Sequence, residues 1–272
     1  MKLIRPQPPW EVIDVPAYNI IRLARSSTEK LNSPNAMEFS RKSGGFLQSL
    51  GHSIVGLIAF YEDDKATGRG LDGSADYQKT STVNIKYFDE IRWYSAFTEL
   101  PDEKASFELV KAGYEAHRND RELVMPCNDP LVAKLIRLAM EAGRVSPLFK
   151  TKSLKLPTKQ TGERSEYGSN PDIIAVIGNA KITELYASYM QKKGRKTGFL
   201  NDLTESEIEK KMKGREDQAL IRPVDLGVVY FDFGFIYAIN NFGIGANAKF
   251  NYGGLARGII PLETKAADVH NC

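Results

Sequence analysis

Residues 225–262 read DLGVVYFDFGFIYAINNFGIGANAKFNYGGLARGIIPL, and the interpretation of the whole chain depends on them. A long apolar run, Leu226 to Ile239, leads into a segment with five glycines in sixteen residues, Gly243 to Gly258. Glycine permits a positive φ and lets the backbone come close to a ligand or another chain. Successive backbone N–H groups in such turns can bind an anion. We therefore predict that Gly243–Gly258 is a binding loop.

Charged and aromatic side chains in this loop are candidate contacts to a nucleic acid. Lys249 and Arg257 can neutralise phosphates, and Phe250 or Tyr252 can stack on a base. A second basic stretch, residues 146–171, is predicted to be a linker, or an arm that becomes ordered on a nucleic acid or a neighbouring subunit. The candidate nucleic-acid-binding residues are Gly243, Gly245, Lys249, Phe250, Tyr252, Gly253, Arg257, Lys150, Lys152 and Lys155.

Composition limits the classes of protein to consider. With 272 residues the chain can form one large domain or two small ones, each with its own core. A net charge of only +3 means that any polyanion site must come from local clustering of charge. Cys127 and Cys272 lie too far apart for a metal-binding motif, which suits a reducing compartment. The first residues show no secretory signal, and no run is apolar enough to span a membrane. We expect a cytoplasmic protein.

The pattern of apolar and polar residues predicts a mixture of helices and strands. Asn128-Asp129-Pro130 is a helix start signal, and Gly143 is a stop signal after residues 131–142. Thr204 and Glu207 have the spacing of a capping box. The predicted helices are 36–50 (interrupted at Gly44-Gly45), 105–117, 131–142, 180–191 and 205–213, and the predicted strands are 53–61, 83–87, 91–97 and 172–177.

The same pattern divides the chain into three parts. Residues 1–149 form an N-terminal α+β part, and residues 150–171 form a basic linker or loop. Residues 172–272 form a C-terminal α+β part that carries the glycine-rich loop.

Catalytic chemistry has little support in the sequence. His52, His117 and His270 are the three histidines, and none has a second ligand at metal-binding spacing. Nucleotide-binding, metalloprotease, serine-hydrolase and kinase signatures are missing from the sequence. We therefore predict no catalytic residues, no metal and no cofactor.

The segment FGIGANAKFNYGGL resembles the C-terminal glycine-rich loop of the repeat-associated RNA-binding (RAMP) superfamily, the subunits of CRISPR effector complexes. One branch of that family carries Gly-x-Gly-Ala-Lys-Thr-x-x-Gly-Tyr-Gly between a short helix and the last strand. The matching context here is 236–242 as the helix and 255–260 as the strand. The matching residues are Gly243, Gly245, Ala246, Tyr252 and Gly253, while Asn247, Ala248 and Asn251 depart from the pattern.

This resemblance implies a fold and a function. The fold would be α+β, with a ferredoxin-like (RAMP-type) core and helical insertions. The function would be non-enzymatic binding of an RNA backbone within a multisubunit CRISPR-type ribonucleoprotein complex for antiviral defense. The partners would be RNA and other protein subunits of a large assembly, with no membrane.

Two alternatives use the same residues differently. A glycine-rich turn also lets subunits pack closely, as in a self-assembling structural protein of a virus or phage particle. The endonuclease branch of the RAMP superfamily pairs a similar loop with an N-terminal histidine, which would be His52. Around His52 the sequence offers only Arg41 and Lys42 as cationic partners.

Overall fold

Three sheets and seven helices make up the part of the chain that the computed structural model describes. Backbone is described for residues 2–4, 10–15, 19–24, 27, 29–43, 45–67, 78–148, 153–155, 168–192, 197–200, 204–228, 242–245 and 248–260. Side chains are described for residues 27, 29–43, 45–58, 78–148, 168–189, 204–226, 244 and 248–259.

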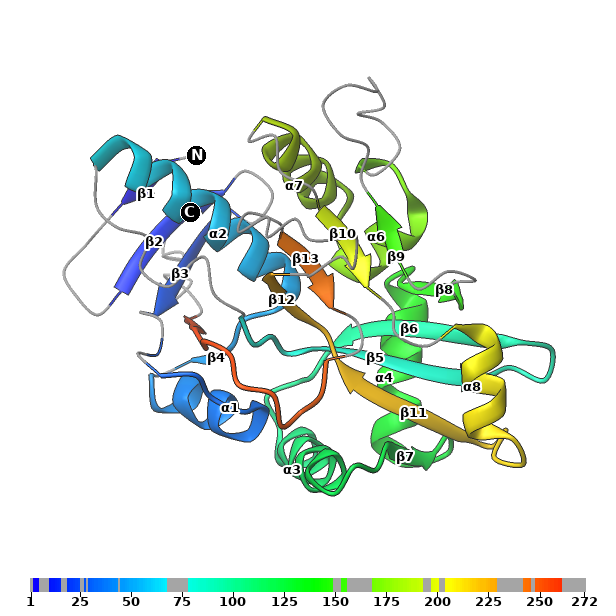
Figure 1. The fold of residues 1–272 in the computed structure, drawn as a ribbon. Coiled ribbons are helices and arrows are strands. Elements are labelled where there is room, and N and C mark those ends of the chain that lie inside the picture. The colour runs from blue at the N-terminus through cyan, green and yellow to red at the C-terminus, as the bar shows by residue number, and fades with distance from the viewer. Residues whose placement is uncertain are drawn as a thin grey trace, which may run out of the picture.

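The central sheet has five antiparallel strands in the order β7-β11-β5-β6-β8 (Figure 1). These strands are β5 (Thr82–Phe88), β6 (Trp93–Glu99), β7 (Leu123–Pro126), β8 (Val145–Pro147) and β11 (Gln218–Pro223). The pair β5–β6 is the hairpin that the alternation at 83–87 and 91–97 predicts. Its loop is held by the Asp89 side chain, which accepts from the N–H groups of Ile91 and Arg92, with Glu90 at φ 77°.

Two further sheets flank the central one. The first has the order β1-β2-β3-β14-β4 and the second the order β12-β13-β10-β9. The strands of the first are β1 (Lys2–Ile4), β2 (Trp10–Val15), β3 (Asn19–Ala24), β4 (Phe46–Leu47) and β14 (Gly258–Ile260). Those of the second are β9 (Ser153–Lys155), β10 (Thr197–Leu200), β12 (Asp225–Val228) and β13 (Phe242–Gly245).

The helices form because their ends are capped and one face of each is apolar. Asp129 caps α4 by accepting from the N–H groups of Leu131 and Val132, and Gly143 follows it at φ 64°. Thr204 and Glu207 form the predicted capping box of α8. The helices are α1 (Ser33–Lys42), α2 (Leu50–Thr67), α3 (Lys104–Arg118), α4 (Pro130–Glu141), α6 (Pro171–Ile177), α7 (Ala180–Lys192) and α8 (Glu205–Met212).

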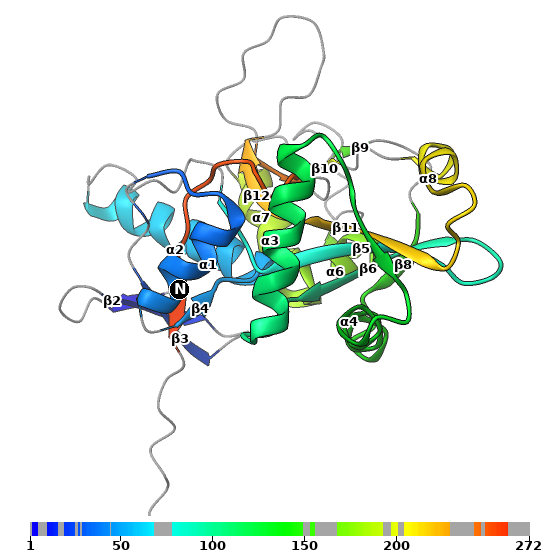
Figure 2. The ribbon, with the colours of Figure 1, turned by 90° about the horizontal axis from the view of Figure 1, so that it is seen from below.

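Side chains alternate along the strands of the central sheet, so the two faces of this sheet pack against different helices. Ile85, Ala96 and Ile221 belong to the cluster that includes residues of α3 and α4, and Figure 2 shows α3 lying across the sheet. Trp93 and Leu220 face the other way, where they pack with Ile208 and Met212 of α8. A third cluster joins α2, α6 and α7 with strand residues such as Ile244 of β13.

Two predicted strands are helices. Residues 53–61 lie within α2, and residues 172–177 lie within α6. An apolar run by itself does not distinguish a buried strand from a buried helix. The deciding signal for α6 is Asn170, whose side chain accepts from two N–H groups of the first turn, followed by Pro171. The predicted helix 36–50 is also corrected, because α1 ends at Lys42 and β4 follows.

The three predicted parts of the chain share their sheets. Strand β14 pairs with β3, and β11 pairs with β5, so residues of the N-terminal and C-terminal parts lie side by side in two sheets. Of the predicted linker, only 153–155 and 168–171 are described.

The mixed α+β class is confirmed, since the chain combines helices with mainly antiparallel sheets. A ferredoxin-like core has the element order β-α-β-β-α-β; the central sheet instead starts with the hairpin β5–β6, and the ferredoxin-like core stays a prediction.

A buried ion pair joins the central sheet region to the C-terminal segment. Lys79 Nζ lies 2.7 Å from Asp225 Oδ2, with side chains only 1% and 0% exposed. The other carboxylate oxygen of Asp225 accepts from the Thr80 N–H, and Lys79 also reaches the carbonyl of Lys249.

Within the described helices, no segment is long and apolar enough to cross a membrane.

We predict that Lys79→Met lowers the free energy of unfolding by about 3–5 kcal/mol, because it leaves the Asp225 carboxylate buried without its cation. Lys134→Met is the matched control, since the Lys134–Glu103 pair is 39% and 37% exposed and should contribute at most about 1 kcal/mol. Urea denaturation of both variants measures the difference. Equal losses in the two variants would contradict the structural role of the buried pair.

Candidate functional site

The predicted binding loop is not one continuous loop. Gly243 and Gly245 lie in β13, which pairs with β12 on one side and with β10 on the other. A glycine inside a strand often marks a place where another backbone comes close. These two glycines therefore serve the sheet, and the turn that the structure describes lies farther on, from Lys249 to Tyr252. Of the helix predicted at 236–242, residues 236–241 lie outside the described part, and Phe242 is a strand residue.

The turn from Lys249 to Tyr252 is fixed by a hydrogen bond within it and by hydrogen bonds to two other parts of the chain. The Tyr252 N–H donates to the Lys249 carbonyl, 3.1 Å away. The Phe250 N–H donates to Nδ1 of His117 over 2.9 Å, and the Asn251 side chain donates to the His117 carbonyl. On the other side, the Ser33 N–H donates to the Phe250 carbonyl over 3.0 Å. The turn is thus held between the end of α3 and the start of α1.

Phe250 anchors the turn instead of offering a stacking face. Its side chain is 1% exposed, and its ring stacks on that of His117 with centroids 5.5 Å apart. A Cβ at Gly113 would lie 2.3 Å from the ring, so only glycine leaves room for Phe250 on α3. The prediction that Phe250 stacks on a base is wrong, because the ring is buried in the core. His117 is a structural residue here.

Arg257 is also removed from the predicted binding surface. Its side chain is 2% exposed, and its carbonyl accepts from the Gln48 N–H and the Ser40 hydroxyl. A guanidinium inside the protein cannot neutralise a phosphate outside it, so this prediction is wrong. Lys150 and Lys152 lie outside the described residues. Lys155 pairs through its backbone with Gly198 in β10, and its side chain is not described.

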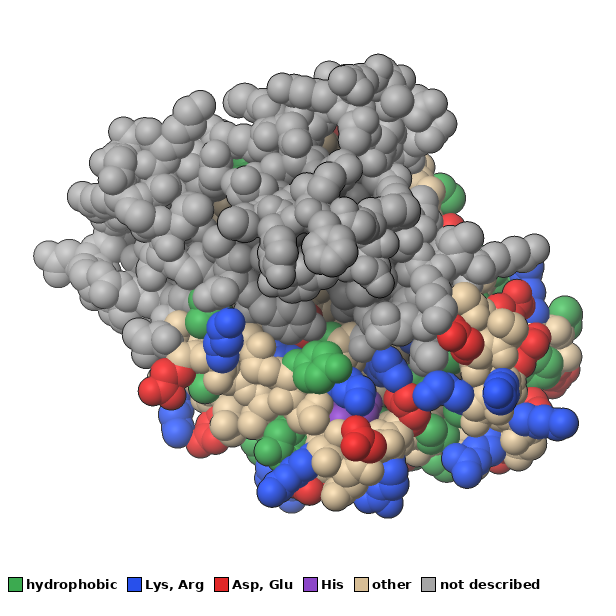
Figure 3. Space-filling view, in the orientation of Figure 1, with side chains coloured by type: hydrophobic (Ala, Val, Ile, Leu, Met, Phe, Trp, Pro, Cys, Tyr) green, Lys and Arg blue, Asp and Glu red, His purple; other side chains and the backbone are tan. Residues whose placement is uncertain are grey.

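What stays on the surface is a small mixed group, which we call the Tyr252 surface. Tyr252 is 49% exposed. Lys249 lies 3.6 Å from Asp120, which follows the end of α3 at φ 52° and has a side chain that is 95% exposed. Gly253 packs on Lys30, because a Cβ there would lie 3.2 Å from that side chain. Figure 3 shows basic, acidic and hydrophobic side chains interspersed over the described part of this face.

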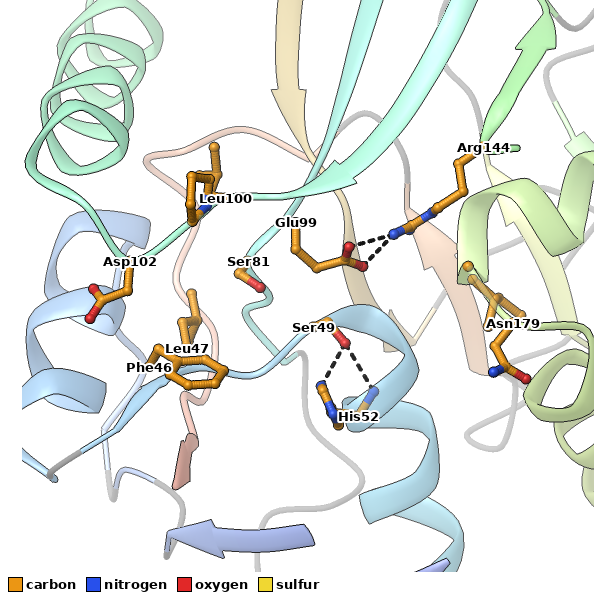
Figure 4. A pocket seen from close by; sticks show the side chains of 13 residues that line it. Phe46, Leu47, Ser49, His52, Ser81, Glu99, Leu100, Asp102, Arg144 and Asn179 are labelled. Carbon is orange, nitrogen blue, oxygen red and sulfur yellow. Dashed lines mark hydrogen bonds and ion pairs between the residues drawn. The ribbon is translucent and has the colours of Figure 1, made fainter. Parts of the chain in front are cut away.

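His52 lies in a different place, on the first turn of α2. The Ser49 hydroxyl accepts from the His52 N–H and lies 2.8 Å from Nδ1 of the ring. Burial lowers the pKa of His52 to about 4, and the Glu99 carboxylate opposes this shift to a smaller extent. The imidazole is therefore neutral at pH 7. It lines a cavity together with Glu99, Arg144 and Asn179 (Figure 4).

The sequence does not reveal the residues that share the cavity with His52, because they are distant from it in the chain. Glu99 ends β6, Arg144 follows α4, and Asn179 stands between α6 and α7. The one local signal is Ser49, three residues before His52, in the position of a helix N-cap. The described side chains contain no group of three or more metal-binding residues.

Comparisons with known proteins bear on the fold. No family model and no curated protein matches the sequence. The chain is similar to a solved structure in which the C-type lectin fold accommodates massive sequence variation in Nanoarchaeota, with a TM-score of 0.53. The two sequences are 16% identical, and the match covers 88% of this chain and 96% of that chain. At this identity the similarity shows the fold alone.

The pKa of His52 predicts a pH dependence of stability. Because the pKa is about 4 in the folded protein and 6.5 ordinarily, the unfolded chain binds the proton first as the pH falls. The contribution of His52 is therefore complete above pH 6.5 and is lost between pH 6.5 and 4. Between pH 6.5 and pH 4, the free energy of unfolding of the wild type should fall by up to about 3 kcal/mol more than that of His52→Gln, which lacks the imidazole. Parallel curves of unfolding free energy against pH for both proteins would contradict the burial of a neutral imidazole.

Proposed function

We propose that the protein is a non-enzymatic recognition protein that binds another protein through the Tyr252 surface. The observation that carries the proposal is a half-exposed tyrosine at the tip of a turn whose backbone is fixed from both sides. Tyrosine supplies a large contact area at a small cost in side-chain entropy and is enriched among residues that dominate interfaces.

Preorganisation supports this proposal. Leu31 and Gly254 exchange both backbone hydrogen bonds, at 2.8 and 3.0 Å, directly beside Tyr252 and Gly253. The buried Phe250 ring fixes the other side of the turn. A partner that docks here orders few additional groups, so little of the interaction energy is lost to entropy.

The charges of the surface favour a protein over a polyanion. Lys249 stands beside Asp120, Lys30 lies against Gly253, and Glu29 is also exposed. A nucleic-acid site needs several uncompensated cations, because affinity for phosphates comes from counterion release. Alternating charges around an exposed aromatic residue are instead the composition of a protein interface rim.

The fold likeness and one stretch of sequence support a recognition role in general, apart from the Tyr252 surface. The similar C-type lectin fold accommodates massive sequence variation, which requires a scaffold that is stable whatever side chains its surface carries. In this chain β12 and β13 pair from Val228 to Phe242, which brings the two ends of residues 229–241 together. That stretch lies outside the described part, and its sequence is rich in the aromatic, Asn and Gly residues of recognition loops: Tyr230, Phe231, Phe233, Gly234, Phe235, Tyr237, Asn240 and Asn241.

The test places the photoreactive amino acid benzoylphenylalanine at position 252 and, as a control, at position 91, where Ile91 is 83% exposed on the β5–β6 hairpin. Irradiation in cells of the source organism should link one partner protein at position 252 and not at position 91. The purified partner should then bind Tyr252→Ala at least about tenfold more weakly than wild type, and Ile91→Ala equally well. Equal capture at both positions, or unchanged affinity of Tyr252→Ala, would refute the proposal.

RNA binding is the second candidate, and the cations Lys30 and Lys249 beside the exposed Tyr252 are the observation that favours it. Such a group can hold two phosphates and stack one base of a single strand. The ferredoxin-like core, the place in a CRISPR-type complex and the cytoplasmic location belong to this candidate as predictions.

A salt titration with a single-stranded oligouridine separates this candidate from the first. If the surface binds RNA, Lys249→Ala should reduce the slope of log affinity against log salt by about 0.7, and Lys104→Ala, exposed at the opposite end of α3, should not change it. An unchanged slope in Lys249→Ala removes the turn from any RNA site. Large particles free of nucleic acid, seen by size-exclusion chromatography, would support the self-assembling alternative instead.

A further inference from the structure

A cavity of about 460 Å³ opens where α2 begins, β6 ends and α6 turns into α7. Its volume lies in the range of small-molecule sites. Figure 4 shows Glu99 near the middle of the group, with Phe46 and Leu47 to one side and Asn179 to the other. We propose that this cavity binds a small organic cation, a primary ammonium group carried on a short apolar stem.

The first step of the argument is the orientation of the Arg144–Glu99 pair. The Arg144 guanidinium donates to the carbonyls of Ala175 and Val176, over 3.0 and 2.9 Å, and to both oxygens of Glu99. The Arg144 side chain is 7% exposed, whereas that of Glu99 is 41% exposed. The Arg144 guanidinium is therefore buried behind the Glu99 carboxylate and bound to three groups, and the carboxylate is the more exposed partner of the pair.

Gly178 makes this arrangement possible. It ends α6 at φ 84°, a left-handed conformation that glycine adopts without strain. A Cβ at this position would lie 2.7 Å from the Cζ atom of Arg144. Gly178 therefore leaves room for the Arg144 guanidinium beside the turn between α6 and α7. In that position Arg144 holds the Glu99 carboxylate.

Beyond Arg144 and Glu99, the charged residue that lines the cavity is a second carboxylate, Asp102. Asp102 is 46% exposed and accepts a hydrogen bond from Arg41 Nε over 2.8 Å. Asp102 lines the cavity, whereas Arg41 is not among its lining residues. His52 is neutral at pH 7 and does not repel a cation. Asn179 follows Gly178 directly, and its amide oxygen is already used, because it accepts from the Ile182 N–H over 3.1 Å. Two carboxylate groups that are exposed in front of a buried guanidinium favour a ligand that donates hydrogen bonds and carries positive charge.

The apolar part of the lining decides the shape of the ligand. Phe46 is 39% exposed at the rim, and Leu47, Leu100 and Ile177 line the cavity beside it. An inorganic cation would gain nothing from these side chains. An alkyl chain of a few carbons would remove them from water, at roughly 0.8 kcal/mol for each methylene buried.

The test uses n-butylamine, with 1-butanol as a neutral probe of the same length. In NMR titrations of the whole isotope-labelled chain, butylamine should shift the amide signals of Glu99, Leu100 and Asn179 saturably, at least about tenfold more tightly than butanol. Glu99→Gln should weaken butylamine binding by about tenfold. Glu141→Gln is the control, because Glu141 is exposed at the end of α4, and it should bind butylamine as wild type does.

A second variant keeps the test decisive if Glu99→Gln, which loosens Arg144, does not fold. Phe46→Ala changes an exposed rim residue and should reduce the preference for butylamine over methylamine while leaving methylamine binding intact. Butanol binding as tightly as butylamine, or no saturable shift with either amine up to about 100 mM, would overturn the proposal. An unchanged chain-length preference in Phe46→Ala would do the same.

Discussion

The buried pair of Lys79 and Asp225 is the interaction on which the arrangement of the sheets depends. Two ions removed from water are costly unless both are fully satisfied, and here the carboxylate also accepts from the Thr80 backbone while the ammonium reaches the Lys249 carbonyl. The segment that carries Lys79 pairs through its backbone with Leu226 and Leu255. One short stretch thus connects the central sheet, the β12–β13 pair and the C-terminal turn, and the position of Tyr252 follows from it.

Local signals in the sequence predicted the elements whose ends are marked by side chains. The cap at Asp129, the capping box of Thr204 and Glu207, and the alternation of β5 and β6 all act within a few residues, so they can be recognised without the fold. Residues 53–61 and 172–177 could not be assigned in this way, because a short apolar run lacks the periodicity that separates a helix from a strand. In α6 the cap at Asn170 carried the missing information.

The candidate sites were harder to predict than the elements. The sequence shows that Phe250 and Arg257 are an aromatic and a cationic residue near glycines, but it does not show that both side chains are buried, with the Phe250 ring packed on Gly113. The cavity around Glu99 is assembled from five separate parts of the chain, and no spacing in the sequence relates them. Tyr252 was predicted as a contact and is exposed, because the turn that buries Phe250 directs its second neighbour outward.

The pairing of β3 with β14 has a consequence for how the chain folds. Ile259 pairs with Leu23, so this contact closes a loop that contains most of the protein. Contacts between residues so distant in sequence form slowly, because the entropy of loop closure is lost before the contact is gained. Until β14 arrives, β3 and β4 each have an unpaired edge that can pair with another chain. The yield of folded protein should therefore depend on concentration and on temperature during refolding, with intermolecular strand pairing as the competing reaction.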